Sequence, residues 1–302
     1  MPRWTIGSPR TLDLGDVAAL KVRVISGSVA ILATDDEPSL DVSSLAGQPL
    51  LVTHEAGILT ITYEDLQWDG LLSWLRPHRH SADVTVTVPA GCPTQLGVVN
   101  ASAIVSGISA KVSAKSVSGD ITLDGVTGSV DAKTVSGDLE AHGLDGEIAF
   151  NSVSGDLTLA GSALGHLDAR TVNGRVTADI DLRDGGGLRV TTISGDVAVR
   201  LPSRASARVD LRSTSGRVHS GFEPASRTSG PGPNTVSATL GSGSANLSVT
   251  SMSGDVTLLE RPQTEAPGDP APGPAAGREH TSDHKQAAES AASTTKGRGD
   301  TR

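Results

Sequence analysis

The sequence predicts an all-β protein whose short strands wind into a β-solenoid (a single-stranded β-helix) with coils of roughly 18–21 residues. Two observations lead to this prediction. A tetrad of the type Val-Ser-Gly-Asp recurs seven times, and the 302-residue chain contains only three Trp, one Tyr and two Phe. A core with so few aromatic side chains must be built from small aliphatic residues. Short repeated units cannot bury a core alone, so each must be stabilised by stacking on its neighbours.

The tetrads recur at nearly constant spacing. Successive tetrad glycines are 18, 18, 19, 21, 21 and 38 residues apart. Because 38 is twice 19, we expect a decayed copy or an insertion before the last tetrad, with residues 222–234 as the inserted loop. The seven tetrads are Val117-Ser118-Gly119-Asp120, Val135-Ser136-Gly137-Asp138, Val153-Ser154-Gly155-Asp156, Val172-Asn173-Gly174-Arg175, Ile193-Ser194-Gly195-Asp196, Thr214-Ser215-Gly216-Arg217 and Met252-Ser253-Gly254-Asp255.

Apolar residues alternate around each tetrad glycine. They lie two positions before it and two and four positions after it, as Val117, Ile121 and Leu123 do around Gly119. Period two is typical of a strand with one buried face. We therefore expect all three positions to point inward, with Val117, Val135 and Val153 stacked inside a narrow tube. A weaker half-repeat at Gly128 and Gly146 predicts a second corner, so that each unit contains two strands.

The parts of the chain outside the regular repeat follow from the same comparison. Residues 91–260 form the regular Ser-Gly-Asp solenoid, and residues 1–90 are predicted to be irregular opening coils or a cap, with a small β-sandwich cap as the alternative. Residues 64–82 break the strand pattern and form an aromatic insertion. Residues 261–302, rich in Pro, Ala, Gly, Ser and Thr, bury too little to order themselves and are predicted to be a disordered tail.

The Ser-Gly-Asp ladder, entered through Val86-Thr87-Val88-Pro89-Ala90-Gly91, resembles a bacterial β-strand-repeat family known as the putative adhesin domain of unknown function. The likeness covers roughly residues 20–259. It implies a single-stranded β-helix, and it implies no established activity.

Charge and composition narrow the possible partners and the compartment. A net charge of −9 disfavours nucleic acid, because non-specific binding to phosphates needs basic patches. The chain has no apolar run long enough to cross a membrane, and the N-terminal residues lack the apolar stretch of a signal peptide. Its single cysteine, Cys92, is compatible with a reducing compartment. We therefore expect a cytoplasmic protein.

The acidic tetrad positions are the strongest candidates for a cation-binding or catalytic site. In-register coils would place Asp120, Asp138 and Asp156 about 5 Å apart, where they could bind Ca²⁺ or shift one another's pKa values. A structural role is the simpler interpretation: the glycine supplies a positive-φ corner, and Ser and Asp bond to nearby backbone groups. On that interpretation the turn ladder comprises Gly119, Asp120, Gly137, Asp138, Gly155, Asp156, Gly195, Asp196, Gly254 and Asp255.

No motif indicates catalysis or a cofactor. Enzymes with a β-helix fold gather unlike catalytic groups in clefts made by long loops, whereas these corners are short and repetitive. His78 and His80 have no second pair at zinc-ligand spacing, and neither a P-loop nor a Gly-x-Ser-x-Gly elbow is present. We expect a protein that is not an enzyme and that uses no metal or other cofactor.

The aromatic insertion is the best candidate for an interaction with another macromolecule. Its apolar side chains, followed by a basic cluster, suggest either a docking face or a cap over the open end of the solenoid. The sequence thus predicts a non-enzymatic scaffold with a protein or other macromolecule as its partner. The alternative is a carbohydrate-binding surface adhesin or a β-helix enzyme acting on polysaccharide. The candidate interaction residues are Trp68, Leu71, Leu72, Trp74 and Leu75.

Overall fold

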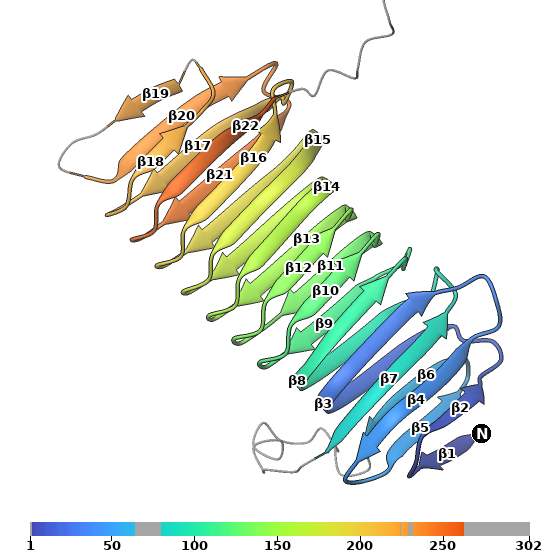
Figure 1. The fold of residues 1–302 in the computed structure, drawn as a ribbon. Helices are drawn as coiled ribbons and strands as arrows, with labels where there is room; N and C mark the ends of the chain where they lie inside the picture. Colours follow the sequence, from blue (N-terminus) through green and yellow to red (C-terminus); the bar gives the residue numbers. More distant parts are fainter. Residues whose placement is uncertain (1, 64–79, 224, 229–231, 263–302) are drawn as a thin grey trace, which may run out of the picture. The chain divides into compact units, whose positions relative to one another are not determined.

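The computed structural model describes residues 2–63, 80–223, 225–228 and 232–262. All 22 regular elements in this part of the chain are β-strands, as Figure 1 shows. The predicted all-β class is therefore confirmed.

The central strands form two parallel ladders on opposite sides of a narrow core, and the chain crosses from one ladder to the other at each corner. One ladder contains β9 (Val112–Ser116), β11 (Thr127–Lys133) and β13 (Asp145–Ser152). The other contains β10 (Ile121–Asp124) and β12 (Leu139–His142). The longer strands β8 (Thr94–Ser106), β14 (Leu157–Thr171) and β15 (Val176–Thr192) bend through a corner and contribute to both ladders.

Equivalent residues of successive turns lie opposite each other. Ile121 pairs with Leu139, and Leu139 pairs with Leu157, at the 18-residue spacing of the repeat. These three side chains are at most 1% exposed. The predicted stacking is thus confirmed for the position two residues after the tetrad glycine. Leu123, four residues after its glycine, is also fully buried.

The valines two residues before the glycine do not point inward, so that prediction is wrong. Val135 and Val153 are 47% and 48% exposed, and Val117 is half-buried. The reason lies in the bend of the chain. Along β9 the buried side chains are Val112, Ala114 and Ser116, so strict alternation turns the next residue outward. The corner then keeps two residues outside before the glycine returns to the interior.

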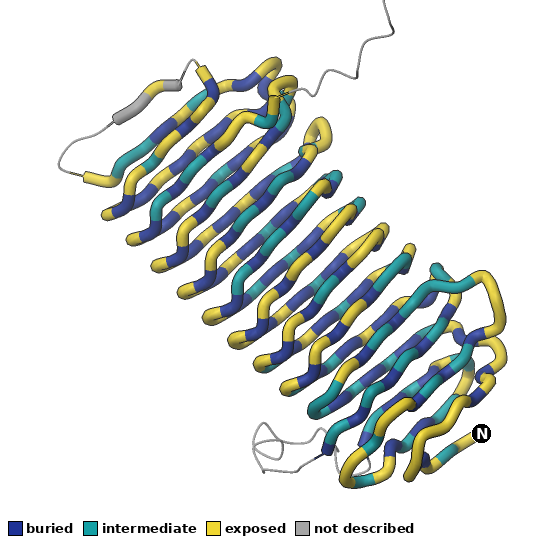
Figure 2. Tube along the Cα trace, viewed as in Figure 1, coloured by how far each residue is buried: buried dark blue, intermediate teal, exposed yellow. Residues whose placement is uncertain are grey.

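The core is a thin aliphatic layer, as expected from the composition. Val, Leu, Ile and Ala make up most of its buried residues, with Phe150 and Tyr63 as the largest fully buried aromatic side chains. Figure 2 shows buried residues alternating with intermediate or exposed ones along the central strands. Turns this narrow leave little space for large side chains, which explains the scarcity of aromatic residues.

The C-terminal turns do not stack in the order of the sequence. β21 (Ala245–Ser251) lies between β15 and β17 (Ala207–Ser213) and is parallel to both. β22 (Val256–Arg261) lies in the same way between β16 (Val197–Pro202) and β18 (Val218–Ser220). The last strands of the described residues therefore fill an internal position of the stack, as Figure 1 shows.

The 38-residue step between tetrads contains an insertion, one of the two possibilities raised by the spacing. The inserted residues form β19 (Ala225–Thr228) and β20 (Asn234–Leu240), an antiparallel pair that continues the sheet beyond β17. This pair covers the last parallel turn.

The N-terminal end is closed by the same device. β3 (Ala19–Ala33) lies between β8 on one side and β6 (Ile58–Tyr63) and β7 (Ser81–Val88) on the other, all parallel. Antiparallel strands then cover β6 and β7, so that the parallel ladders do not end in open edges. These outer strands are β5 (Leu50–Glu55), β4 (Ser39–Ala46), β1 (Arg3–Ile6) and β2 (Arg10–Asp13).

Candidate functional site

The tetrad glycines lie where successive turns approach each other most closely. A Cβ atom on Gly137 would lie 2.1 Å from the carbonyl oxygen of Gly119, and a Cβ on Gly155 would lie 2.1 Å from that of Gly137. None of the seven tetrad glycines has a positive φ, so the predicted positive-φ corner is wrong. Positive φ occurs instead at the opposite corner, with 57° at Gly125 and 60° at Gly143. Glycine is needed in the tetrad because a side chain would collide with the neighbouring turn.

The tetrad aspartates bond to the backbone of the next turn. Asp120 Oδ1 accepts a hydrogen bond from the Asp138 backbone N–H at 3.0 Å, and Asp138 Oδ1 accepts one from Asp156 at 2.8 Å. The same bond joins Asp156 to the Arg175 N–H and Asp196 to the Asp255 N–H. The carboxylates thus tie adjacent turns together. Unlike the bonds within one turn that the sequence suggested, these cross between turns.

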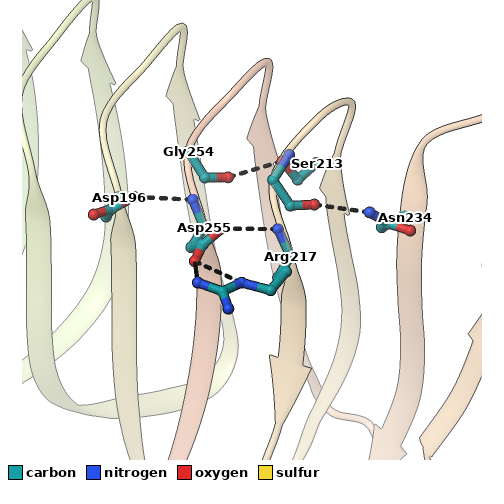
Figure 3. A network of polar contacts seen from close by, with 7 residues as sticks. Asp196, Ser213, Arg217, Asn234, Gly254 and Asp255 are labelled. Atoms are coloured by element: carbon teal, nitrogen blue, oxygen red, sulfur yellow. Dashed lines mark hydrogen bonds and ion pairs between the residues drawn. The ribbon is translucent and has the colours of Figure 1, made fainter.

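This ladder ends at Arg217, in the last parallel turn of the stack. The Arg217 N–H donates to Asp255 Oδ1 at 2.8 Å, and its guanidinium donates to Oδ2 from Nε and Nη2, as Figure 3 shows. The backbone bond, followed by the guanidinium, lowers the pKa of Asp255. No further parallel turn follows. A carboxylate at position 217 would therefore have no tetrad N–H from which to accept a hydrogen bond. Arg217 therefore coincides with the end of the ladder, whereas Arg175 interrupts the Asp pattern inside the stack.

A row of buried hydroxyls at the same corner was missed from the sequence. These residues lie three positions before each tetrad glycine, and five of them accept its N–H, for example from Gly155 to Ser152 Oγ at 2.7 Å and from Gly174 to Thr171 Oγ1 at 2.9 Å. Ser116 instead donates to the Gly119 carbonyl oxygen, and Thr134 donates to Ser152 Oγ. A hydroxyl residue at this offset in all seven copies was the available signal. The residues are Ser116, Thr134, Ser152, Thr171, Thr192, Ser213 and Ser251, and all are buried.

The outward apolar positions of the tetrads form a continuous row on the surface, which we call the corner ridge. Its members are 43–58% exposed. They lie in consecutive turns, because the carbonyl oxygen of each accepts a hydrogen bond from the next corner; one such bond joins Ser154 N–H to Val135 and another joins Ser253 N–H to Ile193. Five turns at about 4.8 Å span about 19 Å. The corner ridge comprises Val135, Val153, Val172, Ile193 and Met252.

The candidate interaction residues of the aromatic insertion lie outside the described residues, and their role in an interaction stays a prediction. They are Trp68, Leu71, Leu72, Trp74 and Leu75. The adjoining residues that the structure describes include Tyr63, which stacks on His80 with ring centroids 5.2 Å apart. Burial and the charge of Asp83 raise the pKa of Tyr63 to about 12.

The described part of the chain contains no group of three or more His, Cys, Asp or Glu side chains arranged to hold a metal ion. Cys92 is a buried free thiol whose pKa is raised by its burial. No helix in the described residues is long and apolar enough to span a membrane.

Comparisons with known proteins place this architecture in a family. No curated protein matches the chain. Among solved structures, a putative adhesin from Bacteroides fragilis is similar at 9% identity and a TM-score of 0.46, over 85% of this chain and 97% of that chain. A putative lipid binding protein from Parabacteroides distasonis is similar at 13% identity and a TM-score of 0.45, over 84% and 97% of the two chains. A putative cell adhesion protein from Clostridium sporogenes gives 11% identity and a TM-score of 0.23, over 84% and 100%. A family model described as Toastrack DUF4097 matches residues 17–259, and the chain therefore belongs to the Toastrack DUF4097 family.

Proposed function

We propose that this protein is a non-enzymatic β-solenoid scaffold of the adhesin type that engages another macromolecule through its corner ridge. The observation that carries the proposal is the continuity of exposed aliphatic side chains over five consecutive turns. Single exposed apolar residues are common on soluble proteins, whereas contiguous apolar surface usually marks an interaction site.

Folding does not require apolar residues at the ridge positions. Thr214 occupies the equivalent place in the outermost tetrad, where Ser215 N–H donates to the carbonyl oxygen of Met252 as in the other corners. A polar side chain therefore fits this corner. The aliphatic residues in the five turns before it are better explained by contact with a partner.

Site-specific photo-crosslinking in cells that make the protein tests the proposal. A photoreactive amino acid placed at Val153 should yield a discrete cross-linked product. The matched control is the same amino acid at Ile104, which is equally exposed at 48% but lies on β8, away from the ridge. Equal cross-linking at both positions, or none at Val153, would contradict the proposal.

A triple variant provides the second arm. Val153→Ser, Ile193→Ser and Met252→Ser together should abolish cross-linking from position 172 while the far-UV circular dichroism and melting temperature stay unchanged. Ile104→Ser with Leu259→Ser removes comparable exposed apolar side chains outside the ridge and should leave the product intact. If both variants reduced the cross-linked product equally, non-specific hydrophobic contact would account for the cross-linking, and the proposal would be contradicted.

A further inference from the structure

A groove with both polar and apolar lining crosses the outer face of the sheet near its C-terminal end. It has a volume of about 680 Å³ and is lined by residues of β17, β19, β20 and β21. This volume is within the range of roughly 300–1,000 Å³ that is typical of small-ligand sites. The corner ridge lies elsewhere: β21 contributes residues near its start to the groove, whereas Met252 follows its end.

The strand register arranges the groove's side chains in two rows. Arg208 lies between Asn246 on β21 and Thr239 on β20. Asp210 lies between Ser248 and Ser237, and Ser226 on β19 extends this second row. Neighbouring strands are about 4.8 Å apart, and successive outward residues on one strand are about 6.8 Å apart. The groove is thus a grid of one guanidinium, one carboxylate, one amide and four hydroxyls.

These polar side chains make no hydrogen bond or ion pair with one another or with any other described residue. The contrast with similar pairs is clear. Asp168 and Arg170 on β14 have the same two-residue spacing and form an ion pair at 2.6 Å. Arg200 and Arg261 both bind Asp179. Arg208 and Asp210 instead lie in a hollow among neutral hydroxyl and amide groups, where both charges remain available to a ligand.

We infer that this groove binds an acidic saccharide, with Arg208 recognising a sugar carboxylate and Asp210 accepting hydrogen bonds from sugar hydroxyls. A guanidinium pairs with a carboxylate through two parallel hydrogen bonds, and both kinds of contact are charge-assisted. The lining contains no aromatic residue on which a neutral sugar ring could stack. Recognition therefore depends on charge and on the many hydroxyl partners.

Strand addition by a peptide does not fit this groove. β17 is hydrogen-bonded to β20 on one side and to β21 on the other, so its backbone groups are already paired. Along β17 a ligand therefore finds unpaired side chains but no unpaired strand edge, which favours a polyhydroxylated molecule over an extended chain that seeks backbone partners.

Isothermal titration of the full chain with trigalacturonate tests the inference, and the corresponding neutral trisaccharide serves as the comparison ligand. Saturable binding of the acidic sugar is expected. Arg208→Gln should weaken it by at least about tenfold, because the variant loses a charge-assisted hydrogen-bonded pair with the sugar carboxylate. Asp210→Asn should weaken binding of both sugars.

Arg212→Gln is the matched control, since Arg212 is exposed on the same strand but does not line the groove. It should leave the affinity unchanged. Absence of saturable binding by the natural chain would overturn the inference, as would equal affinity for the neutral sugar. Equal losses in the Arg208 and Arg212 variants would likewise overturn it, by indicating general charge attraction. None of these outcomes bears on the corner ridge, which uses other residues.

Discussion

At the residue scale, glycine serves two different purposes in this repeat. At the tetrad corner it keeps a side chain away from the carbonyl oxygen of the adjacent turn, as between Gly137 and Gly119. At the opposite corner it allows a positive φ, as at Gly125, where a Cβ atom would meet nothing within 4 Å. The first requirement is steric and arises between turns, whereas the second is conformational and local.

The two kinds of glycine should respond differently to alanine. Gly125→Ala places a Cβ in a left-handed conformation and should lower the free energy of unfolding by about 1–2 kcal/mol. Gly137→Ala carries no such conformational cost, but it must push apart two hydrogen-bonded turns, so a loss of about 3 kcal/mol or more is expected. Urea denaturation of both variants measures the difference. Equal losses would show that contact between turns is not what requires the tetrad glycine.

The end of the aspartate ladder gives a prediction about pH. Asp255 has a pKa below its ordinary value of 3.8, first because the Arg217 N–H bonds to it and second because of the guanidinium. Since the folded pKa lies below the unfolded value, the ionised carboxylate stabilises the fold above that unfolded value. This contribution is lost as pH falls through the folded pKa.

Replacing Arg217 by Gln should raise the pKa of Asp255 only part of the way to its ordinary value, because the backbone N–H of residue 217 still donates. A carboxyl-carbon NMR titration of Asp255 in both chains measures this. A full return to the ordinary value would show that the guanidinium alone lowers the pKa.

At the level of single strands, the direction in which a residue points, into the core or toward water, decides which substitution is tolerated. Leu139 on β12 is 1% exposed and stacks between Ile121 and Leu157, whereas Val135, four residues earlier, is 47% exposed. Polar links on the outer face also join the turns: Asp179 on β15 bonds to Arg200 on β16 and to Arg261 on β22. Each strand thus has an apolar inward side and a polar outward side that cannot be exchanged.

A single aspartate substitution distinguishes the two sides. Leu139→Asp places an unpaired carboxylate in the apolar core and should lower the free energy of unfolding by about 4 kcal/mol or more. Val135→Asp leaves its charge in water and should change the stability by less than about 1 kcal/mol. Thermal melts followed by circular dichroism compare them. Severe destabilisation by Val135→Asp would contradict the outward orientation of the tetrad valines.

At the scale of the whole molecule, the interleaved order of turns makes the end of the described chain part of its interior. β21 and β22 each separate two strands that would otherwise lack a partner on one side. In an ordinary repeat protein, loss of the last unit only moves the end of the stack. Here the last unit holds together the turns that precede it.

Truncation tests this arrangement. A chain that ends at residue 243 lacks β21 and β22, and we expect β15 to β18 to lose protection against amide hydrogen exchange together. A chain that ends at residue 262 keeps every described strand and serves as the control. If only β17 and β18 lost protection in the shorter chain, then β21 and β22 would not be needed to stabilise β15 and β16.

Much of the fold and part of the corner could be predicted from the repeat. The strand class, the 18-residue register and the burial of Ile121 and Leu123 follow from periodicity, because the repeat and the parallel pairing share one spacing. The inward orientation predicted for Val117 was wrong because the chain departs from strict alternation at the corner. The groove could not be predicted, since its two rows come from segments about 40 residues apart whose pairing no local pattern records.

Composition and periodicity were enough to establish that this protein is all-β, that equivalent positions stack, and that the stack is built from aliphatic residues. Which tetrad residues face water, in what order the turns lie and how both ends are covered became clear from the three-dimensional arrangement alone, because the turns are nearly interchangeable. Residues at equal offsets can pair in any order of turns, so the choice among orders depends on the antiparallel end strands and on contacts between distant segments.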